Sequence, residues 1–229
     1  MPRKPRMYLP NVPCHVIQRG NNREATFFAE QDYQFYLECL RDASQRFGVS
    51  IHSYVLMTNH VHILMTPEQQ DSISLTMQSI GRRYVQYINK EYHRTGTLWE
   101  SRHKASLVDA EAYLLICSRY IELNPVRACM VEHPADYRWS SFRANAYGEY
   151  NSVLTSHPVY RALAISSEDQ RNAYYSLFEY EICTSDINKI RNSAQFSMPT
   201  GNNRFKEQIE RAHQRKIGYA KRRRPTKLA

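Results

Sequence analysis

The fold class is decided by the stretch Val49-Ser-Ile-His-Ser-Tyr-Val-Leu-Met57-Thr-Asn-His60-Val-His62-Ile-Leu-Met-Thr66. Two apolar runs, 49–57 and 61–66, flank the short polar link Thr58-Asn59, and Pro67 ends the second run. This pattern predicts two strands joined by a tight, hairpin-like link. Because side chains at positions i and i+2 of a strand share one face, we expect His60 and His62 to project together while Val61 and Ile63 enter the core.

The segments on either side of this hairpin complete an α+β pattern. Further strands are expected over Val12–Gln18, before the polar turn 19–23, and over 102–108, where Arg102, Lys104 and Ser106 alternate. Apolar spacing predicts helices over 31–47, 72–93 and 109–124, the last between Asp109 as N-cap and Pro125 as its stop. The order strand, helix, strand, strand, helix, strand, helix predicts an antiparallel sheet with helices packed on it.

The region after the sheet is expected to form a mostly helical C-terminal extension. Segment 134–150 is rich in aromatic residues and is expected to be irregular. Helices are expected over 157–164, 167–183, 185–195 and 204–216. We therefore expect three parts: an α+β domain over 1–132, an aromatic and helical extension over 133–203, and a basic helix and tail over 204–229.

Charge is concentrated at the two ends of the 229-residue chain, whose formal net charge is +9. Residues 1–23 contain five basic residues and no acid, and residues 204–229 contain ten basic residues against Glu207 and Glu210. Two basic ends suggest a polyanion as partner, either nucleic acid or an anionic membrane, although solvated termini explain the charge equally well.

Several protein classes are disfavoured by the composition. The sequence contains no run of 18 apolar residues, so no transmembrane helix is predicted. No apolar segment follows the basic N-terminus, so no secretory signal is predicted. The five cysteines form no Cys-x-x-Cys pair, so neither a disulfide framework nor a cysteine zinc site is expected. A reducing cytoplasm suits these cysteines.

Two patterns carry possible chemistry. His60 and His62 are placed to share a metal ion if a third protein ligand is nearby, although such a pair is also common as ordinary histidines. In the helix over 109–124, Tyr113, Tyr120 and Asn124 fall on one stripe. A tyrosine hydroxyl can attack a phosphodiester and an amide oxygen can bind a hard metal ion, whereas the alternative is an aromatic stripe packed on the sheet.

These residues resemble a known family. His60-Val61-His62 resembles the His-hydrophobic-His motif of the HUH nucleases, and Tyr120-Ile-Glu-Leu-Asn124-Pro-Val-Arg-Ala128 resembles the nucleophile helix of single-tyrosine transposases. The whole pattern is similar to the REP-associated tyrosine transposases, relatives of insertion-sequence transposases that act on repetitive extragenic palindromes (REPs). Four further stretches agree, namely His15–Arg23, Leu98–Lys104, Tyr137–Ser141 and Asn203–Ile209.

The resemblance implies an HUH/ferredoxin-like nuclease fold and cleavage of single-stranded DNA. Tyr120 is then the nucleophile, leaving a 5′-phosphotyrosine link and a free 3′-OH, with Tyr113 as the rival. His60, His62 and Asn124 are the expected ligands of Mg²⁺ or Mn²⁺, although many relatives carry Gln where this chain has Asn124.

The resemblance implies that the N-terminal region reads a short single-stranded sequence beside the hairpin, with His15, Arg19, Asn21 and Arg23 as the candidates and a solvated turn as the alternative. Arg102 and Lys104 alternate onto one strand face and are expected to line the same groove. The charge of the tail, which contains Arg222, Arg223 and Arg224, predicts contacts with hairpin phosphates.

The expected partner is single-stranded or hairpin DNA, with no membrane and no nucleotide cofactor. We expect a monomer in a bacterial cytoplasm, acting on nucleoid DNA. Two alternatives stay open at this point: a non-catalytic hairpin-binding protein derived from a transposase, and an RNA-processing nuclease.

Overall fold

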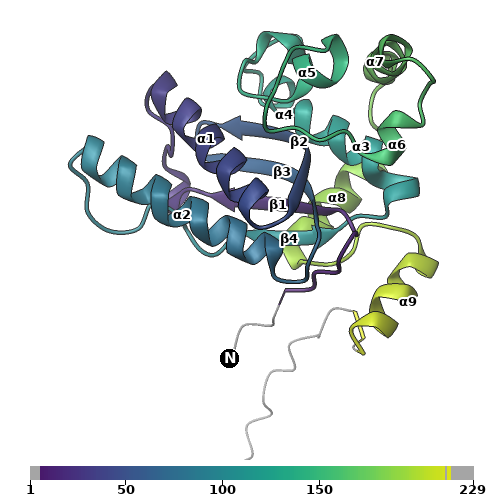
Figure 1. Cartoon of the computed structure of the whole chain (residues 1–229), viewed down its shortest axis with the longest axis horizontal. Helices are drawn as coiled ribbons and strands as arrows, with labels where there is room; N and C mark the ends of the chain where they lie inside the picture. Colours follow the sequence, from purple (N-terminus) through teal and green to yellow (C-terminus); the bar gives the residue numbers. More distant parts are fainter. Residues whose placement is uncertain (1–5, 215, 218–229) are drawn as a thin grey trace, which may run out of the picture.

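The computed structural model describes residues 6–214, 216 and 217, and has a four-stranded antiparallel sheet at its centre (Figure 1). The strands are β1 (Cys14–Arg19), β2 (Val49–Met57), β3 (His60–Pro67) and β4 (Lys104–Leu107), in the order β2-β3-β1-β4. Helices pack around this sheet, which confirms the predicted α+β class. The predicted tail residues Arg222, Arg223 and Arg224 lie outside the described residues.

Two long helices cover one face of the sheet. These are α1 (Glu30–Arg46) and α2 (Ser72–Glu91), and their bounds lie within two residues of the prediction. Val61 and Ile63 of β3 are fully buried in the same core as Tyr36 of α1 and Ile80 of α2. The strand alternation predicted from the sequence therefore places this half of β3 in the core.

The other face of the sheet carries α3 (Ala110–Glu122). Leu114 and Ile121 of α3 pack in one core with Leu64 of β3. Because β3 alternates, His60 and His62 share the face of Leu64 and so lie on the side of α3. The predicted end of this helix at residue 124 is corrected, since α3 ends at Glu122 and a short helix, α4 (Asn124–Arg127), follows with Pro125 in its first turn, where a proline is tolerated.

The C-terminal region is more helical than predicted. Segment 134–150 is not irregular, because it contains the 3₁₀ turn η2 (Pro134–Asp136) and α5 (Phe142–Tyr147). The helix expected over 167–183 ends early and is split into α7 (Ser167–Ser176) and the 3₁₀ turn η3 (Leu177–Glu179). The remaining helices are α6 (Pro158–Arg161), α8 (Thr184–Phe196) and α9 (Asn203–Ala212). Helices this short lack the repeated apolar spacing on which the prediction depends.

Segments of the extension cover both outer edges of the sheet. Along β2, the Leu56 backbone N–H donates to the Trp139 carbonyl at 2.9 Å, and the Thr155 N–H donates to the Ile51 carbonyl at 2.7 Å. Beyond β4, the Thr200 N–H donates to the Leu107 carbonyl at 2.7 Å. The extension is thus attached to the sheet at two places that are far apart in space. Among the described residues, no helix has the length and apolar character needed to cross a membrane.

Candidate active site

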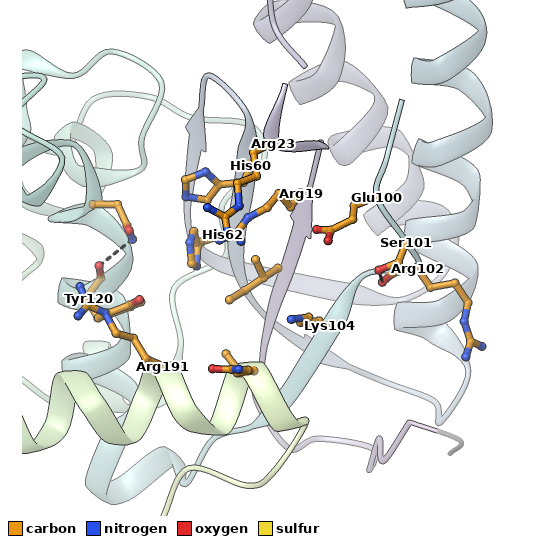
Figure 2. A pocket seen from close by; sticks show the side chains of 14 residues that line it. Arg19, Arg23, His60, His62, Glu100, Ser101, Arg102, Lys104, Tyr120 and Arg191 are labelled. Carbon is orange, nitrogen blue, oxygen red and sulfur yellow. Dashed lines mark hydrogen bonds between the residues drawn. The ribbon is translucent and has the colours of Figure 1, made fainter. Parts of the chain in front are cut away.

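A cavity of about 590 Å³ opens on the α3 side of the sheet (Figure 2). Eight residues predicted to belong to the site line it: Arg19, Arg23, His60, His62, Arg102, Lys104, Tyr120 and Asn124. They come from β1, the turn η1 (Asn21–Arg23), β3, β4 with the loop before it, α3 and α4. Residues more than 100 positions apart in the chain therefore meet in one cavity.

The two histidines and Tyr120 face one another across this cavity. The ring centroids of His60 and His62 lie 5.1 Å apart, with an angle of 74° between the ring planes. The Tyr120 ring lies 6.0 Å from the His62 ring. Strand alternation brings the imidazoles together, and the packing of α3 on the same face brings Tyr120 to them.

Hydrogen bonds assign the free nitrogen of His60. Asn59 Nδ2 donates to the Arg23 carbonyl at 2.8 Å, so Asn59 presents its oxygen in the other direction. That oxygen lies 2.7 Å from His60 Nδ1, which must therefore be the protonated nitrogen of a neutral ring. The lone pair of His60 is then on Nε2.

His62 is held by a second histidine. His15 Nε2 lies 2.8 Å from His62 Nδ1, the two rings stack with centroids 5.0 Å apart, and only 1% of His15 is exposed. The prediction that His15 contacts DNA does not agree with this burial, and we reassign His15 as the partner of His62. Asn21, also predicted to contact DNA, is half-buried in the turn and does not line the cavity.

All three imidazoles are neutral at pH 7. Burial, reinforced by the positive charge of Arg127, lowers the pKa of His15 to about 3. Burial, reinforced by Arg19, lowers the pKa of His60 to about 4, and burial likewise lowers the pKa of His62. Neutral imidazole is the form that binds metal ions. The histidines of the cavity are therefore already in the form that can bind a metal ion at pH 7.

Asn124 presents an oxygen to the cavity. Its Nδ2 donates to the backbone carbonyls of Tyr120 at 2.9 Å and Ile121 at 3.0 Å, which leaves Oδ1 as the free atom of the amide. Within residues 6–214, 216 and 217, no three His, Cys, Asp or Glu side chains gather into a metal site. The Asn124 oxygen is therefore available as a ligand beside the two histidines, and a set of two imidazoles with one amide oxygen suits Mn²⁺ better than Mg²⁺.

Arg127 contacts both the ring and the backbone of Tyr120. The Arg127 guanidinium lies 4.1 Å from the centroid of the Tyr120 ring, and its Nη2 donates to the Tyr120 carbonyl at 2.7 Å. The rival tyrosine has different contacts, since the Tyr113 hydroxyl bonds Asp186 at 3.2 Å and Lys189 at 2.6 Å, and Tyr113 does not line the cavity. Both partners of Tyr113 belong to α8, so Tyr113 helps to hold that helix.

The family model described as "Transposase IS200 like" matches residues 9–124, just over half of the chain. The chain belongs to the IS200-like transposases. The matched region contains His60, His62, Tyr120 and Asn124, and the family predicted from these motifs is confirmed. No curated protein matches this transposase.

Two solved structures are similar to the transposase, and one of them supports its fold. A REP-associated tyrosine transposase bound to a REP hairpin is 20% identical, with a TM-score of 0.57, over 69% of this chain and 93% of that one. A putative transposase from Deinococcus radiodurans R1 is 24% identical over 52% of this chain and 95% of that one, with a TM-score of 0.37. The first of these shows that the transposase has the fold of a REP-associated tyrosine transposase.

Six residues that line the transposase cavity were not predicted from the sequence. They are Ile17, Glu100, Ser101, Arg191, Ala194 and Gln195. Ile17 was identifiable in principle, because it is on the same face of β1 as Arg19. The last three belong to α8, beyond the residues that the family model matches. Their common helical face is visible in the sequence, but no local pattern connects that face with Tyr120.

Proposed function

We propose that this transposase is a metal-dependent single-stranded DNA endonuclease and strand transferase that acts on REP-like hairpins. The observation that carries the proposal is the meeting of Tyr120, His60, His62 and Asn124 in one cavity that also holds five basic side chains. The likeness to a structure bound to a REP hairpin supports this class of DNA.

The proposed reaction is an exchange of phosphoester bonds. Tyr120 Oη attacks a DNA phosphorus, the new Oη–P bond forms, and the P–O3′ bond breaks. The phenolic proton passes to solvent, and the departing 3′ oxygen takes up a proton to become a 3′-OH. The 5′-phosphotyrosine link conserves the bond energy, so a 3′-OH can attack it later and rejoin DNA without ATP.

His60 Nε2, His62 Nε2 and Asn124 Oδ1 would hold the Mg²⁺ or Mn²⁺ ion. When bound, the ion supplies charge neutralisation at the phosphoryl oxygens under attack. The protein groups prepare this site, because Asn59 and His15 engage the Nδ1 atoms of the two ligand histidines. Arg127 meanwhile holds the Tyr120 ring in place.

The strand of DNA next to the reacting phosphate is proposed to follow the basic side of the cavity. Arg19, Arg23, Arg102 and Lys104 line it there, and Arg102 contributes from the loop before β4 rather than from the strand that was predicted to contain it. Binding through such residues depends strongly on salt because DNA releases counterions. Hairpin contacts by Arg222, Arg223 and Arg224 stay a prediction.

The proposal is tested by looking for the covalent link. We expect the protein, mixed with Mn²⁺ and a labelled pool of single-stranded hairpin oligonucleotides of varied sequence, to form an adduct that survives denaturation. Tyr120→Phe removes the attacking oxygen, so it should abolish the adduct and retain DNA binding. Tyr113→Phe removes the rival hydroxyl and should still form the adduct, at a rate reduced only by its lost hydrogen bonds to α8. The matched control is Tyr150→Phe, which should keep the full rate because Tyr150 is 94% exposed and lies outside the cavity.

The possible outcomes separate the alternatives. An adduct formed by Tyr120→Phe would contradict the assignment of the nucleophile. Tight hairpin binding by the wild type without any adduct would instead support a non-catalytic DNA-binding protein. Cleavage of a matched RNA pool without an adduct would support an RNA-processing nuclease.

We further propose that residues 1–132 carry the chemistry, that the extension 133–203 completes the cavity, and that the protein is monomeric. The extension already occupies both edges of the sheet through the carbonyl of Trp139 and the N–H groups of Thr155 and Thr200. A cytoplasmic location stays a prediction.

A further inference from the structure

One wall of the catalytic cavity is formed by α8. Arg191, Ala194 and Gln195 line the cavity at positions i, i+3 and i+4, so they share one face of the helix. Ile190 and Ser193 on another face are buried against the body of the protein. Figure 2 shows the Arg191 side chain reaching from α8 towards Tyr120. This wall therefore faces the reacting end of the cavity.

The α8 wall is firmly attached. Lys189 Nζ lies 4.2 Å above the Tyr113 ring of α3, in addition to its hydrogen bond with the hydroxyl. After α8, Ser106 Oγ of β4 donates to the Met198 carbonyl at 2.6 Å, and Thr200 pairs with Leu107. Because the middle of α8 contacts α3 and the segment after it is bonded to β4, Arg191 is held at the cavity rather than on a loose segment.

Arg191 on this wall and Arg127 beside the Tyr120 ring are two positively charged side chains near the reacting tyrosine. Within the described part of the chain, neither Arg191 nor Arg127 forms an ion pair. Burial lowers the pKa of Arg127, and the charge of Arg191 lowers it further, against the opposite effect of Tyr120. Arg127 Nη1 is also buried without a hydrogen-bond partner. An anion bound in the cavity beside Arg191 would offset this positive charge.

We propose that Arg191 binds the phosphodiester group that Tyr120 attacks, an inference that rests on the function proposed above. Gln195, one turn further along α8, donates a hydrogen bond from its side-chain amide to an adjacent phosphate oxygen. The small side chain of Ala194, of which only 3% is exposed, lies between them on the cavity wall. Negative charge builds on the phosphoryl oxygens as the Tyr120 Oη–P bond forms and the P–O3′ bond breaks, and the planar guanidinium suits such oxygens.

The first test compares Arg191→Gln with Arg82→Gln. Arg82 is an exposed arginine of α2, whose helix covers the opposite face of the sheet, so the control removes the same charge elsewhere. With the hairpin pool and Mn²⁺, we expect Arg191→Gln to slow formation of the Tyr120 adduct by about 100-fold, as for loss of one donor to a charged transition state. We expect Arg82→Gln to stay within about twofold of the wild type, as do most exposed substitutions, and Arg191→Lys to recover part of the rate.

The second test needs no catalysis. The logarithm of the dissociation constant is measured against the logarithm of salt concentration with the same oligonucleotides. Loss of one phosphate contact should reduce the slope by about 0.7 for Arg191→Gln and leave it unchanged for Arg82→Gln. Equal rates and equal slopes for the two variants would overturn the proposal. If the wild type forms no adduct but the slope still falls, the phosphate contact stands and the proposed reaction fails.

Discussion

At the scale of single residues, the two imidazoles of the cavity are oriented by different partners. Asn59 bonds His60 Nδ1, whereas the buried His15 bonds His62 Nδ1. Partners of this kind typically change metal affinity by 10- to 100-fold. We predict that His15→Phe weakens Mn²⁺ binding by about 10- to 100-fold, measured by the electron paramagnetic resonance signal of free Mn²⁺ during titration.

His103→Phe is the control for this variant. His103 is also a buried histidine, and its Nε2 lies 2.6 Å from the Tyr8 hydroxyl, outside the cavity. We expect it to change Mn²⁺ affinity little even if it lowers stability. Equal Mn²⁺ affinity in His15→Phe and wild type would show that His15 does not orient His62.

Sequence reasoning succeeded for the residues whose placement is local. His60 and His62 share a face because strand geometry alone requires it. Tyr120 lines the cavity with them, and its role as nucleophile, which was assigned through the resemblance of its helix, stays a prediction. The role of His15 could not be predicted. Its contact with His62 joins positions 47 residues apart and depends on the register of β1 against β3, which pairs Ile17 with His62 and leaves His15 on the diagonal.

At the scale of elements, the turn after β1 depends on Gly20. A Cβ atom there would lie 2.3 Å from the Glu24 carbonyl oxygen and 2.7 Å from Thr26 Cγ2. The Gly20 N–H also donates to the Asn59 carbonyl at 2.8 Å, so a shift of this turn disturbs both Arg23 and the residue that orients His60. We predict that Gly20→Ala lowers the free energy of unfolding by about 1–3 kcal/mol and weakens single-stranded DNA binding, measured by chemical denaturation and by titration.

Gly81→Ala is the control, and it is expected to raise the free energy of unfolding rather than lower it. Gly81 is inside α2, and a Cβ atom there meets nothing within 4 Å, so alanine should raise helix stability by about 0.5–1 kcal/mol. If both variants had the same stability and DNA affinity, the tight packing at Gly20 would not matter to the site.

The long helices could be predicted from the sequence, whereas the short helices and the contacts between distant elements could not. The long helices α1 and α2 carry several turns of apolar spacing, and their bounds were predicted to within two residues. The short helix α5 has six residues and was missed. The position of α8 against the cavity was also missed, because its contact with Tyr113 joins residues 76 positions apart and leaves no periodic trace in either segment.

At the scale of the whole molecule, Glu122 ties the extension to the catalytic helix. This fully buried residue of α3 accepts hydrogen bonds from Ser141 at 2.5 Å, Asn145 at 2.9 Å and Tyr174 at 2.7 Å. Burial raises its pKa from 4.5 to about 7, against the effect of these hydrogen bonds. The folded protein therefore retains a proton on Glu122 at pH values where the unfolded chain has lost it.

This difference predicts a pH dependence of stability. The contribution of Glu122 is complete below pH 4.5 and is lost as pH rises to about 7. We predict that the free energy of unfolding of the wild type, relative to Glu122→Gln, falls by about 3 kcal/mol between pH 5 and pH 8. Chemical denaturation at a series of pH values measures it. The exposed Glu132→Gln should show no such trend, and a constant difference between wild type and Glu122→Gln would contradict the prediction.

The covered edges of the sheet limit how the protein can be shortened in evolution. Exposed strand edges are where foreign strands attach, and they are a common starting point for aggregation. Here the backbone groups of β2 and β4 are bonded to Trp139, Thr155 and Thr200 of the same chain. Loss of the extension would thus do more than remove one wall from a cavity. It would expose the edges of β2 and β4 at the same time. A shortened descendant would therefore have to acquire another protection against self-association before selection could improve its activity.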